Sequence, residues 1–401
     1  MEKFKEVFEK LTDVQKILVV VIAAILLYGV STGVSYTIFG GLKSGGAGTF
    51  NLTTALPGPS TTMEEDVNDP KTETCPLNGE LKSKKAKDAW EKRRPLAVMI
   101  ENHIEARPQS GLTAADVVYE AVAEGGITRF LAIFYCNLSD VQIGPVRSAR
   151  TYYLDWLGEY NNPLYAHVGG ANTPGPADAL SQIIKYQIDD LNQFSIGFPT
   201  FWRDYQRLTH SVATEHTMYS TTQKLWDVGA KRGWVATSSA GIAWNEGFTS
   251  WKFKDDEKSS SASKAGETTK AISVNFWESQ SDYKVEWNWD PATNTYKRRH
   301  AGVDHTDFDN KKQISPKNVV VQFEREANAN DGYPGNVHLL YTTTGMGKAL
   351  FFMNGNAVAG KWIKPDRLTR TKYVDGSGKE IAFNKGQIWI ETVPEGSKVT
   401  Y

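Results

Sequence analysis

Two arginines lie three positions apart in the stretch GPVRSAR, residues 144–150, directly before a helix-like run at 151–160. Arg147 and Arg150 each carry a guanidinium fork that can bind a carboxylate or a phosphate through two parallel hydrogen bonds. The start of a helix adds unpaired backbone N–H groups, which attract anions and repel cations. The stretch therefore predicts a negatively charged partner, either an external anion or acidic side chains of the same chain.

An external anion would draw on polar residues that follow two apolar runs, LAVMIEN at 96–102 and LYAHVGG at 164–170. If these runs are parallel strands, their carboxyl ends meet the helix starts at one edge, where such sheets bind ligands. Glycines there let a ligand approach the backbone closely. The residues predicted to bind the ligand are Arg147, Arg150, Ser148, Asn102, His103, His167, Gly169 and Asn172.

A structural ion network competes for the same two arginines. Three carboxylates recur every four residues in a segment predicted to be helical, so they form one acidic row. Like charges at that spacing destabilise a helix unless nearby cations pair with them. The predicted network consists of Asp116, Glu120, Glu124 and Arg129. The residues alone do not decide between this network and a ligand site, and both interpretations stay open.

Two carboxylates, Glu101 and Glu120, are candidates for a general acid–base pair, although nothing in the sequence fixes their separation.

His103, His167 and His216 could ligate a metal, but no two of them have the four-residue helical spacing that makes such a site specific. Hydrogen-bonded histidines are the favoured interpretation, and we predict no metal site and no cofactor. There is no G-x-S-x-G nucleophile elbow.

Short apolar runs and helix signals alternate in the first half of the chain, which predicts an α/β domain with a mostly parallel sheet. The strands are predicted at 96–102, 129–135 and 164–170. The helices are predicted at 110–126, 151–160 and 220–234, with another after TPGPADAL. In the first helix, Thr113 is the expected cap and Gly125-Gly126 the expected end. From residue 271 onward, β-branched and aromatic runs separated by turn signals predict an antiparallel β-rich domain.

An uncharged run at 17–39 is long enough to span a membrane as one helix, since about 20 residues suffice. Lysines are concentrated before it, which places the N-terminus in the cytoplasm and the bulk of the chain outside. A cleaved signal peptide is the alternative. The expected segments are a cytoplasmic N-terminus at 1–16, a single-pass transmembrane anchor at 17–39, a flexible linker at 40–92, an α/β domain at 93–245, a polar loop at 246–270 and a β-rich domain at 271–401.

The charge balance is even, with 45 Lys and Arg against 46 Asp and Glu, so we expect no nucleic-acid partner. The chain has two cysteines, Cys75 and Cys136, which an exported protein could join. Sequence does not supply the geometry that a disulfide needs, and their pairing stays open.

The stretches RPLAVMIENHIEARPQSGLTAADVVYEAVAEGGITRFLAIF and IGPVRSARTYYLDWLGEYNNPLYAHVGG resemble the YerB-like family of bacterial extracytoplasmic proteins. EHTMYST, DHTDF and the terminal GKEIAFNKGQIWIETVP are similar to that family's C-terminal domain. The resemblance implies an extracytoplasmic location and two domains, but no established activity. Family members are described as lipoproteins, whereas this chain has no cysteine within residues 1–74 to accept a lipid.

The sequence thus favours a membrane-anchored accessory protein that binds an anionic wall polymer or glycan of the cell envelope through an arginine-lined cleft. An enzyme acting on such glycans or phosphates, with a glutamate as acid–base and an arginine stabilising negative charge, is the alternative. A structural scaffold is the third possibility.

Overall fold

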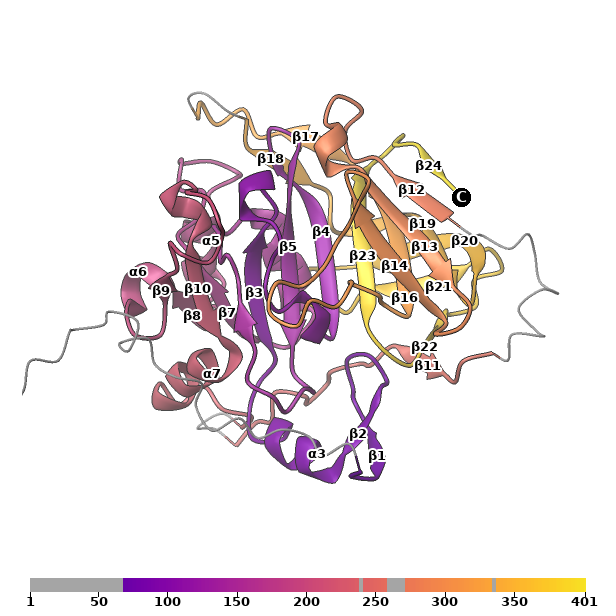
Figure 1. Ribbon diagram of the computed structural model, residues 1–401, viewed down its shortest axis with the longest axis horizontal. Helices are drawn as coiled ribbons and strands as arrows, with labels where there is room; N and C mark the ends of the chain where they lie inside the picture. Colours follow the sequence, from indigo (N-terminus) through magenta and orange to yellow (C-terminus); the bar gives the residue numbers. More distant parts are fainter. Residues whose placement is uncertain (1–67, 238–240, 258–270, 334–336) are drawn as a thin grey trace, which may run out of the picture. The chain divides into compact units, whose positions relative to one another are not determined.

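A ten-stranded mixed sheet runs through the part of the chain that the computed structural model describes, residues 68–237, 241–257, 271–333 and 337–401 (Figure 1). Antiparallel neighbours outnumber parallel ones: β5 pairs antiparallel with both β4 and β3, whereas β3 pairs parallel with β7. The strand order is β21 (Lys372–Asp375), β20 (Asn356–Lys364), β19 (Gly345–Met353), β16 (Asn318–Glu324), β23 (Ile388–Pro394), β4 (Val117–Glu124), β5 (Ile127–Phe134), β3 (Leu96–Glu101), β7 (Leu164–His167) and β8 (Asp190–Asn192).

The predicted α/β domain with a mostly parallel sheet is wrong, and the error lies in the segment 110–126. Its apolar residues form the central strand β4, which is buried on both faces, and not a helix with one apolar stripe. A continuously apolar run fits both periods, so periodicity alone does not separate the two. Gly125 and Gly126 both have positive φ and close the β4–β5 hairpin where a helix end was expected.

In the part of the chain that the structure describes, five smaller sheets accompany the large one. The largest of them contains β15 (Val303–Asp304), β14 (Thr295–His300), β13 (Val285–Asp290), β12 (Ala271–Val274) and β24 (Val399–Thr400). A three-stranded sheet contains β6 (Gln142–Ile143), β10 (Met218–Thr221) and β9 (Trp202–Arg203). The pairs are β1 (Lys71–Thr74) with β2 (Leu81–Ser83), β11 (Lys252–Lys254) with β22 (Ala382–Asn384), and β17 (Glu326–Asn328) with β18 (Leu339–Tyr341).

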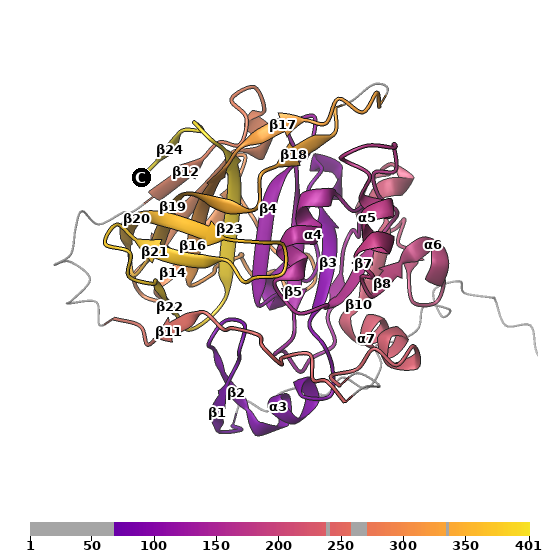
Figure 2. The same cartoon turned by 180° about the vertical axis from the view of Figure 1, so that it is seen from behind.

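The α-helices of the described residues are short and lie outside the sheets. They are α3 (Lys84–Trp90), α4 (Thr151–Gly158), α5 (Ala179–Lys185), α6 (Gln193–Ile196) and α7 (Thr222–Lys231). The helices expected at 151–160 and 220–234 are present as α4 and α7, and the strand expected at 96–102 is β3. In Figure 2, α4 lies across the β4–β5 region of the large sheet.

Aromatic contacts join the layers. On one face of the large sheet, Trp156 of α4 stacks on Tyr119 of β4 with ring centroids 5.5 Å apart. The five-stranded sheet packs against the large one through Trp287 of β13 and Trp389 of β23, 5.4 Å apart. Because β23 also pairs parallel with β4, strands from both halves of the chain share one sheet and one core.

The predicted anchor at 17–39 and the cytoplasmic segment at 1–16 lie outside the described residues. Within the described residues, no helix has the length and apolar character to cross a membrane. The last part of the expected linker is folded, since it contains β1, β2 and α3. Cys75 in this part forms a disulfide with Cys136, which answers the question that the sequence left open.

Candidate functional site

A pocket of about 580 Å³ opens beyond the carboxyl end of β7. Its polar lining includes Arg147, Ser148, Asn172, Arg203 and Glu215, and its apolar lining includes Leu180, Phe194 and Met218. Four of the residues that the sequence placed in a ligand site are therefore at this pocket: Arg147, Ser148, Gly169 and Asn172.

Backbone hydrogen bonds hold the arginine stretch between β3 and the end of β7. The N–H of Arg147 donates to the carbonyl of Met99 at 2.9 Å, and its own carbonyl accepts from the N–H of Val168 at 3.0 Å. The N–H of Ala149 donates to the carbonyl of Gly169 at 2.9 Å. Segments about 20 to 50 residues apart in sequence thus meet at one place, because the stretch adds to the sheet like a short extra strand.

Arg147 is paired on one side only. Its Nε donates to Oε1 of Glu101 at 3.0 Å. Among the described residues, neither of its two Nη atoms has a hydrogen-bond partner, and 24% of its side chain is exposed. Burial lowers the pKa of Arg147 in spite of Glu101, but a guanidinium remains charged at neutral pH. The free edge of Arg147 therefore offers two N–H donors to a ligand in the pocket.

Two further charges border the pocket. Arg203 of β9 is half-buried, and its Nη1 donates to the backbone carbonyl of Thr214. Glu215 is exposed, and its own backbone N–H together with the nearby Arg147 lowers its carboxyl pKa below the usual value. The pocket therefore carries two cations against one exposed carboxylate, which favours an anionic ligand.

A pair of histidines lies behind Arg147. The second carboxylate oxygen of Glu101 accepts a hydrogen bond from Nδ1 of His216 at 2.9 Å. Burial alone would lower the pKa of His216, but the hydrogen bond to Glu101 and the negative charge of that carboxylate together raise the pKa above its usual value. His103 stacks on His216 with ring centroids 4.6 Å apart, and burial beside that ring lowers the pKa of His103.

His103 and His216 come together with Glu105, whose Oε2 is 3.5 Å from Nε2 of His216. The rings are parallel to within 7°, so their lone pairs do not converge on one point as metal ligands do. His103 also accepts a hydrogen bond from the N–H of Glu105 through Nδ1. This cluster therefore favours hydrogen-bonded imidazoles, and the prediction of no metal site remains a prediction.

Arg150 belongs to the ion network and not to the pocket. It is buried, and its Nη2 pairs with Oε2 of Glu124. Arg129 pairs with the other oxygen of the same carboxylate at 3.3 Å. Burial alone would raise the pKa of Glu124, but Arg129 and Arg150 lower it to about 2. This part of the expected network is present.

The other two acids of the expected row have different partners. Glu120 is fully buried and pairs with Arg298 at 2.6 Å, so it cannot act on a ligand as an acid or base. Asp116 accepts from the backbone N–H groups of Tyr135 and Cys136, and burial raises its pKa to about 6. Arg298 comes from the second half of the chain, so no local sequence pattern could predict this pairing.

Two predicted ligand residues are structural. Asn102 is fully buried, and its side-chain amide donates to Glu120 and Thr128. His167 is also buried and pairs with Oδ1 of Asp190 at 2.6 Å. Neither side chain reaches the pocket, because both point into the packed layers beside β3 and β7.

The glycines at the pocket serve the protein's own side chains. A Cβ on Gly169 would lie 2.9 Å from the ring of Phe194, and one on Gly170 would lie 2.9 Å from Leu180. The sequence explained Gly169 by the approach of a ligand, whereas the close approach seen is that of Phe194. Sequence reasoning missed Phe194 and Arg203, since α6 and β9 have only four and two residues and give no periodic signal.

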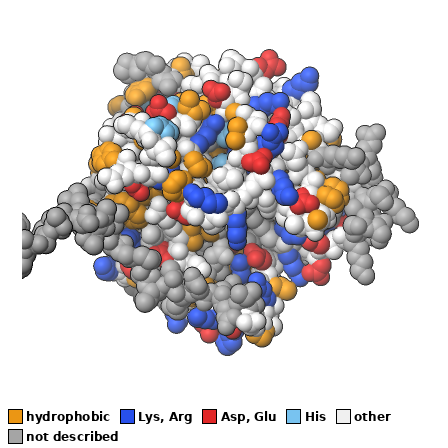
Figure 3. All heavy atoms as spheres, in the orientation of Figure 1, with side chains coloured by type: hydrophobic (Ala, Val, Ile, Leu, Met, Phe, Trp, Pro, Cys, Tyr) orange, Lys and Arg blue, Asp and Glu red, His pale blue; other side chains and the backbone are white. Residues whose placement is uncertain are grey.

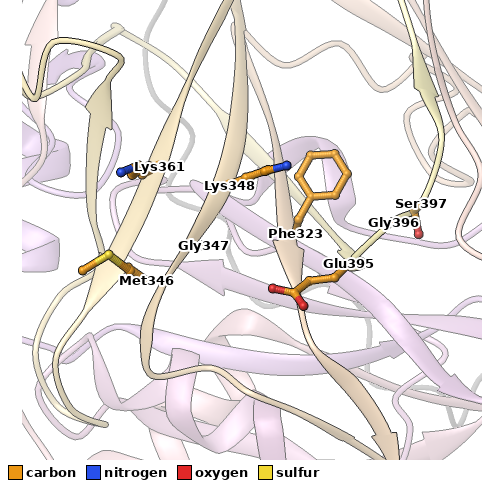
Figure 4. A pocket seen from close by; sticks show the side chains of 8 residues that line it. All are labelled: Phe323, Met346, Gly347, Lys348, Lys361, Glu395, Gly396 and Ser397. Atoms are coloured by element: carbon orange, nitrogen blue, oxygen red, sulfur yellow. The ribbon is translucent and has the colours of Figure 1, made fainter.

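A second pocket, of about 600 Å³, lies over β19 and β20 and contains Lys348 and Lys361 (Figure 4). These residues are cross-strand partners, but in Figure 4 their side chains point in opposite directions. Figure 3 shows acidic and basic side chains interspersed over one face of the protein. Overall charge thus does not locate a site, and the Arg147 pocket is distinguished by two guanidiniums at one cavity.

Two family models match the two halves of this chain. The models are described as the N-terminal and C-terminal domains of a protein of unknown function (DUF3048), and they match residues 78–235 and 272–390. The chain belongs to this family.

It is 30% identical over 322 residues to the Bacillus subtilis (strain 168) protein named "Putative lipoprotein YerB", covering 80% of this chain and 87% of that one. The crystal structure of YerB protein from Bacillus subtilis superposes with a TM-score of 0.67 at 27% identity, covering 82% of this chain and 100% of that chain.

Proposed function

We propose that this protein is a membrane-anchored, extracytoplasmic binding protein that recognises an anionic polymer or glycan of the cell envelope in the Arg147 pocket. The observation that carries the proposal is the unpaired Nη edge of Arg147, which faces a cavity that Arg203 also borders. A bidentate donor at a cavity wall is suited to a phosphate or carboxylate group. Ser148 and Asn172 add neutral polar groups for the rest of the ligand.

The proposed location rests on three independent features. The uncharged run at 17–39 with lysines before it favours a retained anchor and an exported bulk. The Cys75–Cys136 disulfide is typical of an oxidising compartment outside the cytoplasm. The curated relative carries the word lipoprotein in its name, which fits a membrane-attached protein.

The first prediction concerns Arg147. Substituting Arg147→Gln removes a charged double donor, and we expect the affinity for purified phosphate-bearing wall fragments to fall about 10- to 100-fold, the worth of a charge-assisted hydrogen bond. Isothermal titration calorimetry on residues 59–401 measures this, and the affinity of the unaltered protein should also fall with added salt.

Lys348→Gln is the matched control, because Lys348 is an exposed cation at the second pocket. It should leave the affinity unchanged. Full affinity in the Arg147 variant, or a loss in the Lys348 variant, would remove the ligand from the Arg147 pocket and refute the proposal.

An enzyme acting on the same ligands is the second candidate, and the Glu101–His216 pair favours it. A carboxylate that accepts from Nδ1 of a histidine orients the ring and stabilises its protonated form, as general acid–base catalysis requires. Incubating wall fragments with residues 59–401 and assaying new reducing ends and released phosphate tests it. The absence of products between pH 5 and pH 8 would leave binding as the sole activity of the pocket.

A further inference from the structure

The three most exposed large hydrophobic side chains of the described residues lie close together in the fold. Ile184 is 79% exposed, Phe194 is 75% exposed and Phe198 is 71% exposed. They belong to α5, to α6 and to the turn after α6, and Figures 1 and 2 both show these two helices side by side beyond β7 and β8. We call these three residues the apolar rim.

The apolar rim continues the lining of the Arg147 pocket. Phe194 itself lines the pocket and packs over Gly169, while Leu180 packs over the adjacent Gly170. Ile184 follows Leu180 by one turn of α5, so both project from the same side of that helix. Phe198 lies in the turn directly after α6. A cationic cavity and a protruding apolar surface are therefore contiguous.

We propose that the apolar rim and the Arg147 pocket together dock on an anionic phospholipid bilayer, with a lipid phosphate at Arg147 and Arg203 and the rim inserted among the acyl chains. This goes beyond the proposed function: it keeps the Arg147 pocket as the binding site but assigns its anion to a lipid headgroup in place of a wall polymer or glycan. Apolar side chains beside cations are the arrangement by which a protein surface binds an anionic membrane.

The chemistry of the rim favours a lipid over a sugar chain. An aromatic ring can stack on a sugar, but Ile184 is aliphatic and has no flat face, so glycan binding does not explain why it is exposed. Single exposed hydrophobics are ordinary on protein surfaces, whereas here the exposed ring of Phe194 lines a charged pocket and Ile184 extends the same side of α5 as the pocket residue Leu180.

A bilayer is also within reach of this surface. Between residue 39, where the predicted anchor ends, and residue 68, where the described residues begin, the sequence has fewer than 30 residues. Even fully extended, such a stretch spans only about 100 Å. The folded part therefore stays near the membrane to which the anchor would attach it, and a weak docking surface acts at high local lipid concentration.

The test uses residues 59–401, which form one compact unit and include the region matched by the crystallised relative over its whole chain. Binding is measured by co-sedimentation with vesicles of phosphatidylglycerol and phosphatidylcholine, and with phosphatidylcholine alone. We expect binding to the anionic vesicles, decreasing with salt, and much weaker binding to the neutral ones. Equal binding to both vesicles, or to neither, overturns the inference.

The variant Phe194→Ser/Phe198→Ser should bind anionic vesicles at least about tenfold more weakly, since two large apolar groups no longer leave water. Val303→Ser, a control at an exposed position of the five-stranded sheet, should bind as the unaltered protein does. Unchanged binding by the Phe194 and Phe198 variant refutes the inference.

Soluble ligands separate this inference from the proposed function. If phosphate-bearing wall fragments bind residues 59–401 through Arg147 and anionic vesicles do not bind, the pocket recognises a free polymer and only the lipid docking falls. If Arg147→Gln abolishes vesicle binding and wall fragments never bind, the lipid is the ligand. If Arg147→Gln affects neither, both proposals fall.

Discussion

Arg147 and Arg150 are the same residue type three positions apart, yet they have opposite environments. The stretch that carries them is extended and hydrogen-bonded to its neighbours, and Arg150 has φ −135° and ψ 152°. In an extended chain, residues an odd number apart point to opposite sides. Arg150 therefore enters the interior to meet Glu124, while Arg147 faces the pocket. Arg150 thus takes part in an ion network, whereas the binding of a ligand by Arg147 stays a prediction.

Glu124 supplies the second prediction. Its pKa is about 2 in the folded protein, against 4.5 normally, so folding is stabilised above pH 4.5 and this stabilisation is lost as the pH falls toward 2. Glu124→Gln should lower the free energy of unfolding by about 3 kcal/mol at pH 7 and by about 1 kcal/mol at pH 3. Urea denaturation at both pH values measures it. A difference that does not shrink with acid would contradict the assignment.

Glu324 of β16 supplies the third prediction, with the opposite sign. Burial raises its pKa from 4.5 to about 8, in spite of a hydrogen bond from Gln322. Folding is therefore unhindered below pH 4.5 and becomes less favourable as the pH rises toward 8, because the folded state must keep the proton.

Glu324→Gln is neutral at every pH, and its amide oxygen can still accept from Gln322. We expect the variant to be more stable than the unaltered protein by about 3 kcal/mol at pH 7 and by about 1 kcal/mol at pH 5. Urea denaturation at these two pH values measures the gain. A variant that is less stable at pH 7 would show that the carboxylate is charged and paired in the folded state.

At the scale of elements, strands and helices with an unambiguous pattern could be predicted from the sequence. The run at 96–102 is β3, and the amphipathic run at 220–234 contains α7, whose cap Thr221 accepts from the N–H of Lys224. Segment 110–126 could not be resolved, because a strand packed on both faces is as apolar as a helix stripe. The segment is a strand because it pairs with β5 and β23, and both of these strands lie outside the segment.

The expected acidic row is divided in the fold, because its carboxylates have separate partners. A bulge between Val122 and Glu124 breaks the alternation of β4, so Glu120 meets Arg298 of β14, whereas Glu124 meets Arg129 and Arg150 near the start of α4. Their partners could only come from the fold: Arg298 reaches Glu120 from β14, more than 170 residues away. The pocket likewise depends on β9 and α6, which are too short to show a periodic pattern of apolar residues in the sequence.

At the scale of the whole protein, residues 71–90 tie both halves of the chain together. The side-chain amide of Asn78 donates to Asp116 at 3.0 Å, and its backbone carbonyl accepts from the N–H of Gly386 at 2.9 Å. A Cβ on Gly79 would collide with the ring of Phe253. The stretch assigned to a flexible linker on composition alone is thus packed against the core, and the Cys75–Cys136 disulfide fixes it there.

The last prediction concerns that disulfide. It joins residues 61 positions apart, and a cross-link closing a loop of this size stabilises a protein by about 4 kcal/mol through the entropy of the unfolded chain. Reducing residues 59–401 should lower the melting temperature by about 6 °C, and Cys75→Ser/Cys136→Ser should melt at the same temperature with or without reductant. A fragment beginning at residue 93 lacks Cys75, Asn78 and Trp90, so it should melt below the reduced protein, since Trp90 also packs 6.2 Å from Tyr135. Circular dichroism follows all three. If the shorter fragment had the same melting temperature as the oxidised protein, residues 71–90 would not stabilise the fold, and the disulfide would not help to hold the two halves together.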